Sequence, residues 1–406
     1  MHSLARRAGR TDAMTRPLNP RVSRDEMERR WQLVRAAMEQ HHIDVLLAQG
    51  HTEFLGGYVR YLTDIAAFSG VATTVVFPRD SGSIVVTHGP LQDVAVSPGD
   101  DGPWRGVARV LSAPNYASIN HSGPAEQSHI VTALAPYANA TIGLLGLQLV
   151  SASTLEAIRS AYPKARIIDA SGVVDPIRAI KSPEEQGLIR LTGALQDATM
   201  SQIFDEIKPG MKERDVSIRA QEIAMSMGSD QGVYLCGSAP LGGLAVPRMF
   251  RDQHRVLQEG DMLHLLLETN GPGGYFTHMV RTAVFGTAPP RLKDELEFAL
   301  QAQKHTVGLL RPGALPTEIW EKHNEFMREH GRPEETRVYC HSQGYDMMER
   351  PNICAEETLP IAVNMNIGCH PSYIYEDVFA WVCSNYLIGD DGPEPVNNLT
   401  TEIFER

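Results

Sequence analysis

Residues 260–285 read GDMLHLLLETNGPGGYFTHMVRTAVF, two apolar runs separated by a turn rich in glycine and proline. This pattern is typical of a β-hairpin. Glu268 and His278 stand inside the apolar runs, where a polar side chain is seldom buried without a partner. The hairpin therefore predicts a sheet that carries a carboxylate and an imidazole, although a histidine that is simply hydrogen-bonded in the core is the alternative for His278.

Three later segments place more polar groups within short apolar runs. They read CHSQGYDMMERP at 340–351, MNIGCHP at 365–371 and AWVCSNYLI at 380–388, which is the last predicted strand. Polar side chains on separate strands can converge when those strands share one sheet. We therefore expect the hairpin and these segments to lie in one sheet, with His341 and His370 near His278.

The region before residue 181 has a different pattern. Ser23 is a predicted N-cap, with Glu26 as its capping-box partner, for a helix that runs to about Gln40. Short apolar runs at 44–48, 71–77, 83–88, 141–147 and 165–171 surround helical patterns such as 152–162. Strands that alternate with helices predict an α/β domain with a partly parallel sheet.

A new domain is predicted to begin at Lys181-Ser182-Pro183-Glu184-Glu185. Serine is a favourable N-cap, proline suits the first helical turn, and the two acids favour the positive end of the helix dipole. Helices are expected at 183–206, at 213–228 and, with a break at Arg311-Pro312-Gly313, at 291–330. The predicted division is an unstructured tail (1–20), an N-terminal domain (21–180) and a catalytic domain (181–406).

Composition limits the classes of partner. The 406 residues carry a formal net charge of −12, with 42% hydrophobic and 21% charged residues. Without a long Lys/Arg run, nucleic acid is not an expected partner, and without an apolar run of about 18 to 20 residues neither is a membrane. Five cysteines without CxxC spacing do not form a disulfide framework. We expect a cytoplasmic protein that acts on a small molecule.

The C-terminal half contains five motifs in a specific order. These are Gly260-Asp261, Gly274-Tyr275 through His278 to Arg281-Thr282, His341 to Gly344 with Glu349 and Pro351, His370-Pro371, and Cys383-Ser384 ahead of Asp391-Gly392. In this order the half resembles the "pita-bread" catalytic domain of the creatinase, prolidase and methionine aminopeptidase superfamily. The N-terminal half and its Lys181-Ser182 junction resemble the creatinase and prolidase branch. The resemblance implies an α/β fold, with a creatinase-like N-terminal domain and a pita-bread catalytic domain, and a homodimer in which the N-terminal domain caps a neighbour.

The ligand positions depart from that superfamily. Where its peptidases hold two metals with Asp, Asp, His, Glu and Glu, the matching positions here are Leu266 or Glu268, His278, His341, His370 and Cys383. One carboxylate and neutral imidazoles cannot offset the charge of two divalent cations. The departures predict one divalent transition metal (Fe, Mn, Zn or Ni) on His278, His341 and His370, with Glu268 or Cys383 as a fourth ligand.

Several residue roles stay open from the sequence. In a metal-free site, as in the creatinase and ectoine hydrolase that the chain also resembles, Glu268 is the nucleophile or base. Cys383 is alternatively a small buried hydrophobe. Tyr345, Asp346 and Glu349 are candidates to orient a ligand or the substrate. Arg248 and Arg251 are candidates to bind a substrate carboxylate, against the alternative that they only face solvent.

The resemblance implies a hydrolase that cleaves a C–N bond (amide, amidine or lactam) in a small polar compound that is not a peptide. Without a two-metal bridge, Xaa-Pro peptides are expected to be poor substrates. Three alternatives remain. The chain could be a lyase, like the dimethylsulfoniopropionate-cleaving members, or an oxygen-dependent ring-cleaving enzyme, in either case with a mononuclear three-histidine centre. It could be an Xaa-Pro-type metallopeptidase, or a binding protein that has lost its metals.

Overall fold

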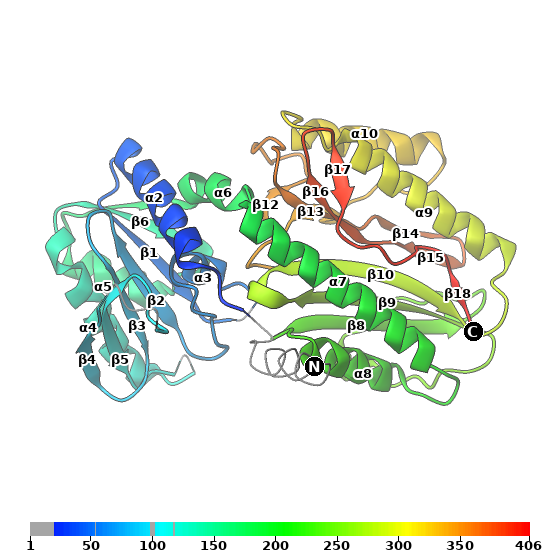
Figure 1. Cartoon of the computed structure of the whole chain (residues 1–406), viewed down its shortest axis with the longest axis horizontal. Helices are drawn as coiled ribbons and strands as arrows, with labels where there is room; N and C mark the ends of the chain where they lie inside the picture. Colours follow the sequence, from blue (N-terminus) through cyan, green and yellow to red (C-terminus); the bar gives the residue numbers. More distant parts are fainter. Residues whose placement is uncertain (1–19, 53, 98–101, 117) are drawn as a thin grey trace, which may run out of the picture.

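The computed structural model describes residues 20–52, 54–97, 102–116 and 118–406. Two α/β lobes lie side by side, the first coloured blue to cyan and the second green to red (Figure 1). The predicted tail lies outside the described residues except for Pro20. The mixed α/β class and the order of the two kinds of domain are as predicted.

The first lobe contains a seven-stranded sheet in the order β4-β5-β3-β2-β1-β6-β7. Strands β1 and β6, β6 and β7, and β3 and β5 pair in parallel, and the other neighbours are antiparallel. The expected partly parallel sheet is therefore present. Its strands are β1 (Val45–Gly50), β2 (Thr73–Pro78), β3 (Ser83–His88), β4 (Gln92–Ala95), β5 (Val107–Ala113), β6 (Thr141–Leu145) and β7 (Arg166–Asp169).

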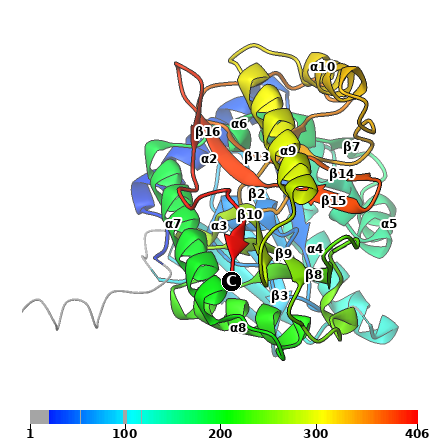
Figure 2. The same ribbon diagram turned by 90° about the vertical axis from the view of Figure 1, so that its right-hand side faces the viewer.

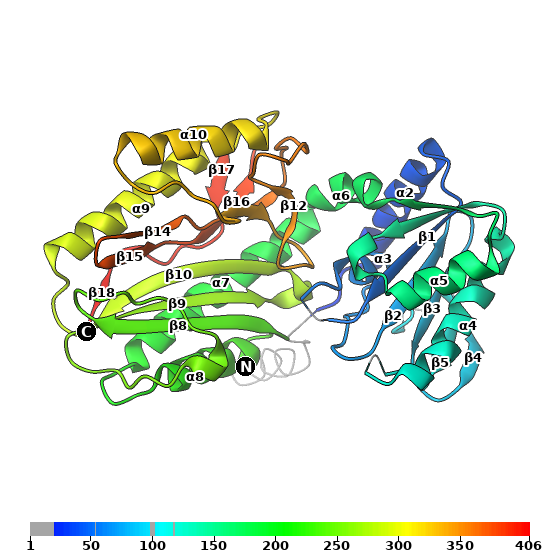
Figure 3. The same ribbon diagram turned by 180° about the vertical axis from the view of Figure 1, so that it is seen from behind.

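Helices cover both faces of this sheet (Figure 3). One core is shared with α2 (Arg24–Gln40), α3 (Gly57–Thr63) and α6 (Ser171–Ala179), and the other with α4 (Gly123–Leu134) and α5 (Ala152–Ala161). Short 3-10 helices join the elements of the chain at η1 (Asn120–Ser122), η2 (Ala135–Tyr137), η3 (Leu147–Leu149), η4 (Phe250–Asp252) and η5 (Pro272–Gly274).

The two predicted helix caps differ in outcome. Ser23 does cap α2, since its side chain accepts from the backbone N–H of Glu26, but the predicted capping box is not closed. The backbone N–H of Ser23 donates to Glu184 instead, and the Glu26 carboxylate pairs with arginines. At α7 (Pro183–Glu206) the capping box is complete between Ser182 and Glu185. The first cap therefore also connects the two lobes.

The second lobe contains three sheets. A four-stranded sheet runs in the order β18-β10-β9-β8, a five-stranded sheet in the order β12-β11-β13-β16-β17, and β14 pairs with β15. The strands are β8 (Gly232–Pro240), β9 (Asp261–Asn270), β10 (Phe276–Val284), β11 (Cys340–Ser342), β12 (Glu349–Asn352), β13 (Asn366–Cys369), β14 (Ser372–Tyr375), β15 (Val378–Trp381), β16 (Ser384–Ile388), β17 (Pro393–Pro395) and β18 (Phe404–Glu405).

Four long helices cover the outside of this lobe (Figure 2). Helices α7 and α8 (Glu213–Ser226) share a core with β9 and β10, which includes Leu265, Leu267 and Met279. Helices α9 (Pro290–Leu309) and α10 (Pro316–Glu329) cover the other sheets. Successive residues of a strand face opposite sides, so Glu268 and His278 point away from the α7–α8 core. Alternation therefore directs both polar groups to the inner face of the lobe.

Two predictions about the strands are wrong. The expected last strand at 380–388 is divided into β15 and β16, and β17 and β18 follow it. The four polar segments also do not share one sheet, because β10 belongs to the four-stranded sheet and β11, β13 and β16 to the five-stranded one. A bridge between Val280 and Cys383 joins these sheets. The polar groups therefore converge between two sheets.

Within the part of the chain that the structure describes, no helix is long and apolar enough to cross a membrane. The five cysteines are all free thiols, as their spacing predicts.

Candidate metal centre

Three histidines from two of the three sheets of the second lobe meet in one cluster. His278 lies in β10, His341 in β11, and His370 directly after β13. Their ligand-capable atoms all lie within 4.8 Å of one another. The ring centroids are 4.9 to 5.2 Å apart, and each pair of rings is close to perpendicular. Three imidazoles that face a common point from three directions form a facial set of the kind that binds a transition metal.

The histidine cluster depends on a close approach between its strands. Gly368 in β13 pairs with His341 across the five-stranded sheet. A Cβ atom at Gly368 would collide with Nε2 of His278. Glycine at this position therefore leaves the space in which the ring of His278 lies.

Two of the three rings have a buried nitrogen that lacks a partner. Among the described residues, Nε2 of His278 and Nε2 of His370 make no hydrogen bond. Nδ1 of His341 lies 3.0 Å from the carbonyl oxygen of Ser342. In contrast, both ring nitrogens of the buried His264 have partners, Thr282 and the carbonyl of Phe379. Buried polar atoms are rarely left unsatisfied, and here a metal ion would satisfy them.

Burial keeps two of the three rings, His341 and His370, neutral. It lowers the pKa of His341 to about 4, with the neighbouring His278 adding to the effect. Burial also lowers the pKa of His370 well below its usual value, again with the other two histidines contributing. Neutral imidazole is the form that coordinates a metal. At neutral pH these two rings are therefore in the ligand state.

Glu268 stands beside the cluster on β9, where it pairs with His278. Its Oε1 lies 3.5 Å from Nδ1 of His278, and its side chain is 15% exposed. It accepts a hydrogen bond of 2.9 Å from Nε2 of Gln343. Glu268 therefore combines contact with a candidate ligand and partial access to solvent, as a general base requires.

A network of three buried amides lies behind the histidines. Besides Glu268, Nε2 of Gln343 donates to the carbonyl of Met347 (2.9 Å). Asn385 Nδ2 donates to Oε1 of Gln343 (2.9 Å) and to Oδ1 of Asn366 (3.0 Å). Asn385 Oδ1 accepts from the backbone N–H of His278 (3.0 Å). These three residues were not predicted as part of the site, although each lies in one of the polar segments at 340–351, 365–371 and 380–388.

Cys383 is buried next to the cluster but does not join it. Its thiol donates to the carbonyl of His278 (3.5 Å), and its sulfur is not among the grouped ligand atoms. Burial raises the pKa of this thiol well above its usual value. A protonated thiol that donates to a backbone carbonyl behaves as a small buried side chain.

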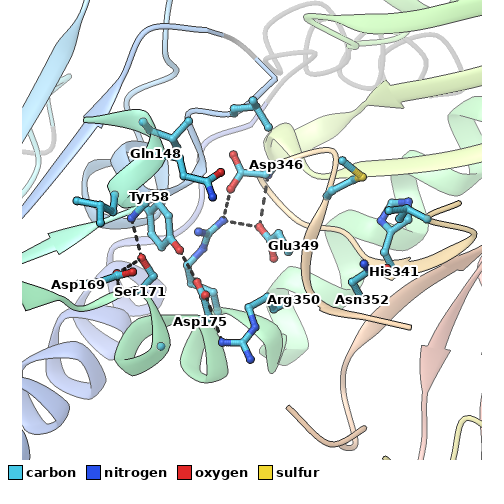
Figure 4. Close-up of a pocket in the computed structure, with 18 residues that line it drawn as sticks. Tyr58, Gln148, Asp169, Ser171, Asp175, His341, Asp346, Glu349, Arg350 and Asn352 are labelled. Atoms are coloured by element: carbon cyan, nitrogen blue, oxygen red, sulfur yellow. Dashed lines mark hydrogen bonds and ion pairs between the residues drawn. The ribbon is translucent and has the colours of Figure 1, made fainter. Parts of the chain in front are cut away.

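Tyr345, Asp346 and Glu349, the candidates to orient a ligand or the substrate, each have a hydrogen-bond partner in the first lobe. Asp346 and Glu349 each accept 2.6 Å hydrogen bonds from Nη2 of Arg178, as Figure 4 shows. Lys181 also binds Glu349 (2.7 Å). The hydroxyl of Tyr345 accepts a bond from Arg30. These contacts join the two lobes, and a role of the three residues in orienting a ligand or the substrate stays a prediction.

Arg248 and Arg251 do not contact the cluster either. Arg248 donates to the fully buried carboxylate of Glu213 (2.6 Å), and the side chain of Arg251 is 88% exposed. Arg337, which was not predicted as a site residue, precedes β11 and pairs with Glu335. Its positive charge helps to lower the pKa of His370.

Two family models match this chain. Residues 187–390, half of the chain, match the model of metallopeptidase family M24, and residues 30–180 match the creatinase/prolidase N-terminal domain. The chain belongs to metallopeptidase family M24. This M24 protein is thus a hydrolase of the creatinase/prolidase type, and the family relation supports a divalent metal as its cofactor.

Its curated relatives are distant. An uncharacterized hydrolase/peptidase, y4tL, of Sinorhizobium fredii is 28% identical over 43% of this chain and 46% of its own length. An Xaa-Pro dipeptidase of Pyrococcus furiosus is 23% identical over 65% of this chain and 75% of its own. A creatinase of a Bacillus species is 26% identical over 46% and 47%. The match with this M24 protein thus covers less than half of the length of two of these relatives, y4tL and the creatinase.

Solved structures agree in fold. The dipeptidase PepE of Mycobacterium ulcerans superposes with a TM-score of 0.76 at 21% identity, covering 95% of this chain and 99% of that one. The prolidase of Thermococcus sibiricus gives 0.76 at 17% identity, covering 95% and 100%. With identities below 25%, these neighbours show the fold alone.

The donor set decides how many metal ions fit this M24 protein. The family resemblance implies two, held mainly by carboxylates. Here the grouped donors are three histidines, and Glu268 is the carboxylate beside them. Neutral imidazoles add no negative charge, so the residues do not fit a pair of divalent ions. They do fit one ion, because buried nitrogens of His278 and His370 lack other partners within the described structure.

Proposed function

We propose that this chain hydrolyses a C–N bond of a small amide-type molecule, with one divalent metal ion on His278, His341 and His370. The observation that carries the proposal is the set of three imidazoles, two with unsatisfied buried nitrogens, beside the partly exposed carboxylate of Glu268. Such a metal, when bound, acts as a Lewis acid that polarises a carbonyl-type group.

Glu268 is the proposed general base. Its carboxylate is accessible enough to meet a water molecule and close enough to His278 to act within the same site. It would accept a proton from the attacking water and later donate a proton to the leaving nitrogen. The hydrogen bond from Gln343 holds one carboxylate oxygen, which leaves the other free for this transfer.

Two substrate classes compete. The curated relatives named Xaa-Pro dipeptidase support a peptide bond to proline. The replacement of carboxylates by histidines supports a compound that is not a peptide, such as a small amide, amidine or lactam, because a dinuclear site is not supplied. The relatives favour the first class and the donor set favours the second, so both belong in one assay.

The test starts with metal analysis of the purified protein and reconstitution with Zn²⁺, Mn²⁺, Fe²⁺ or Ni²⁺. Each metal-loaded form is then assayed against Xaa-Pro dipeptides, a guanidino compound, a lactam and simple amides. We expect one equivalent of metal and cleavage of at least one C–N bond. The variant Glu268→Gln should lose about 10² to 10⁴ in kcat while it still binds metal.

Other outcomes would count against the proposal. Two equivalents of metal with rapid Xaa-Pro cleavage would support the dinuclear peptidase alternative. Oxygen consumption or release of a volatile sulfide without C–N cleavage would support the oxygenase or the lyase. Full activity of Glu268→Gln would remove the general base from the scheme.

We further propose that the protein is a cytoplasmic homodimer that binds neither nucleic acid nor membranes. The match of residues 30–180 to the creatinase/prolidase N-terminal domain and the formal charge of −12 support this proposal. Sedimentation at micromolar concentration tests it, and a clean monomer would refute the dimer.

A further inference from the structure

The orientation of the Gln343 side chain follows from backbone groups that can play only one part in a hydrogen bond. The backbone N–H of His278 can only donate, and it donates to Oδ1 of Asn385 (3.0 Å). The other end of this amide, Nδ2, therefore donates to Oε1 of Gln343 (2.9 Å). Nε2 of Gln343 donates to the backbone carbonyl of Met347, which can only accept (2.9 Å). Both ends of the Gln343 amide are thus fixed.

Both hydrogens of the Gln343 Nε2 group are in use. One is donated to the carbonyl of Met347 and the other to Oε1 of Glu268, each at 2.9 Å. Nδ1 of His278 lies farther away, 3.4 Å from Nε2, and no hydrogen remains for it. Oε1 of Glu268 lies 3.5 Å from the same Nδ1, where a carboxylate oxygen repels a lone pair but attracts an N–H group. In the neutral ring of His278, the proton is therefore on Nδ1 and the lone pair is on Nε2.

The other two rings of the cluster leave the same nitrogen free. Nδ1 of His341 lies 3.0 Å from the carbonyl oxygen of Ser342, which can only accept, so the lone pair of the neutral ring is on Nε2. Nε2 of His278 and Nε2 of His370 are buried and make no hydrogen bond within the described structure. His264 on β9 has the opposite arrangement, because its Nε2 lies 3.0 Å from a backbone carbonyl. The partners of each ring therefore decide which nitrogen is free.

The position of the His278 proton depends on Glu268. Without Oε1 of Glu268, one hydrogen of Gln343 loses its acceptor and has Nδ1 of His278 within reach, 3.4 Å from Nε2. To accept this hydrogen, His278 must carry its own proton on Nε2. A nitrogen that carries a proton cannot coordinate a metal ion.

We propose that Glu268 is a positioning residue as well as the general base: its Oε1 holds His278 in the Nδ1–H form, so that Nε2 faces the metal ion. Carboxylates commonly hold the nitrogen of a ligand histidine that does not contact the metal. The other carboxylate oxygen remains for proton transfer. The inference rests on the proposed function, in which His278 binds a metal ion, but the ring proton can be observed in the metal-free protein without turnover.

Long-range ¹H–¹⁵N correlation spectra of the full-length protein, labelled with ¹⁵N-histidine and freed of metal with a chelator, show which ring nitrogen is protonated. The spectra are recorded well above the ordinary pKa of histidine, and the signal that His278→Gln removes is that of His278. We expect a proton on Nδ1 of His278 in the wild type and in Glu268→Gln, whose amide oxygen still accepts from Gln343. In Glu268→Ala the proton should move to Nε2. His264 is the internal control, since its proton should stay on Nε2 in all of these proteins.

Calorimetric titration with Zn²⁺ measures the consequence for the metal site. We expect Glu268→Gln to bind Zn²⁺ as tightly as the wild type and Glu268→Ala to bind it about 10- to 100-fold more weakly. In the Glu268→Ala background, the further change Gln343→Met should raise the affinity, because it removes the donor that competes for Nδ1. Glu394→Ala removes a carboxylate that is 61% exposed, and should bind Zn²⁺ as the wild type does.

The outcomes separate this inference from the proposed function. A proton on Nε2 of His278 in the wild type would overturn the inference, as would an unchanged proton position and Zn²⁺ affinity in Glu268→Ala. A wild type that binds no Zn²⁺ would refute the proposed function and the metal as the reason for this arrangement. Normal Zn²⁺ binding with the expected ring protons, but without cleavage of any C–N bond, would refute the hydrolysis alone and support the positioning role.

Discussion

Two buried polar clusters of this chain differ in whether the chain itself supplies partners for their polar groups. At the boundary of the lobes, Arg178 and Lys181 meet Asp346 and Glu349 in contacts of 2.6 to 2.7 Å. In the second lobe, His278, His341 and His370 meet without an opposite charge except Glu268, and two ring nitrogens have no partner in the described structure. Each charge of the first cluster meets an opposite charge of the chain, although Nε of Arg178 makes no hydrogen bond within the described residues. In the second cluster, Glu268 is the only such partner among the described residues.

This difference separates a structural role from a functional one. Buried charges are tolerated when each is paired, and the pairing then joins the elements that carry them. Buried imidazole nitrogens without partners cost free energy unless a ligand completes them. Residues close together in the sequence, such as His341 and Glu349, can therefore belong to clusters with unrelated roles.

The largest expected effect comes from removing a histidine of the second cluster. Replacement of His278, His341 or His370 by alanine should lower metal affinity by more than about 100-fold. Even residues that only orient a ligand cost about 10- to 100-fold when removed. Metal analysis after dialysis against a weak chelator measures this loss.

The matched control for these variants is His254→Ala, which changes an exposed histidine and should leave metal content unchanged. Circular dichroism should show that all four variants are folded, since a polar cavity tolerates truncation better than a packed core. One full equivalent of metal in His370→Ala, with unchanged affinity, would mean that the cluster is not the metal site.

The next effect concerns stability. Arg178→Ala leaves Asp346 and Glu349 buried with Lys181 as the remaining cation, which binds Glu349 alone. Breaking a buried ion pair on one side costs about 3 to 5 kcal/mol. Urea unfolding measures this loss, and the folded variant should still bind one metal ion.

Arg190→Ala is the control, since Arg190 and Glu394 form an exposed pair with 47% and 61% of their side chains accessible. Such pairs contribute about 0 to 1 kcal/mol. An equal, small loss in both variants would show that the boundary cluster stabilises no more than a surface pair. Loss of metal in Arg178→Ala would show that the two clusters are coupled.

Local sequence patterns predicted most of the elements of the fold. The apolar runs with turns predicted the β9–β10 hairpin, and the Ser182 cap predicted the start of α7. The convergence of the three histidines could be inferred because each interrupts or ends an apolar run, and the runs follow one another in the order of the superfamily motifs. Alternation along a strand then fixes which face such a residue takes.

The sequence did not predict side-chain contacts between residues that lie far apart in the chain. Asp346 and Glu349 are neighbours of His341 in sequence, but their partner Arg178 lies 168 and 171 residues away. The roles of Gln343 and Asn385 depend on a hydrogen bond across 42 residues. Composition and periodicity contain no information about such pairs, since they arise from strand register and from the packing of the two lobes.

As the pH falls, the histidine cluster should lose its contribution to the free energy of unfolding at a higher pH than the charged cluster at the boundary of the lobes does. The pKa of His341 is lowered from 6.5 to about 4, whereas that of Glu349 is lowered to about 2. Between pH 6.5 and 4 the unfolded chain binds a proton at His341 that the folded chain does not. This contribution to stability is therefore complete above pH 6.5 and falls by up to about 1.4 kcal/mol per pH unit as the pH drops toward 4.

Urea unfolding of the metal-free protein at pH 7 and pH 4.5 tests this sign. His264 and His323, whose pKa values are lowered to about 4 and about 3, also contribute to the acid sensitivity. The informative quantity is therefore the difference between the wild type and His341→Gln, which cannot titrate at this position. The variant should lose less stability on acidification, and an identical loss in both proteins would contradict the pKa assignment.

The smallest expected effect tests whether the buried amides belong to the histidine cluster or only to the core. Gln343→Met keeps the approximate volume but removes the hydrogen bonds to Glu268 and Asn385. Since Asn385 also holds the backbone of His278, we expect metal affinity to fall about 10- to 100-fold. The visible spectrum of the Co²⁺-loaded protein should change as well, because the ligand His278 is no longer fixed.

Gln196→Met provides the control. Gln196 is equally buried, and its Nε2 donates to the backbone carbonyl of Thr277, which lies on the same strand as His278. It should lose stability without any change in the Co²⁺ spectrum. If both variants lose stability alike and bind Co²⁺ as the wild type does, the amides stabilise the core and take no part in positioning the ligands.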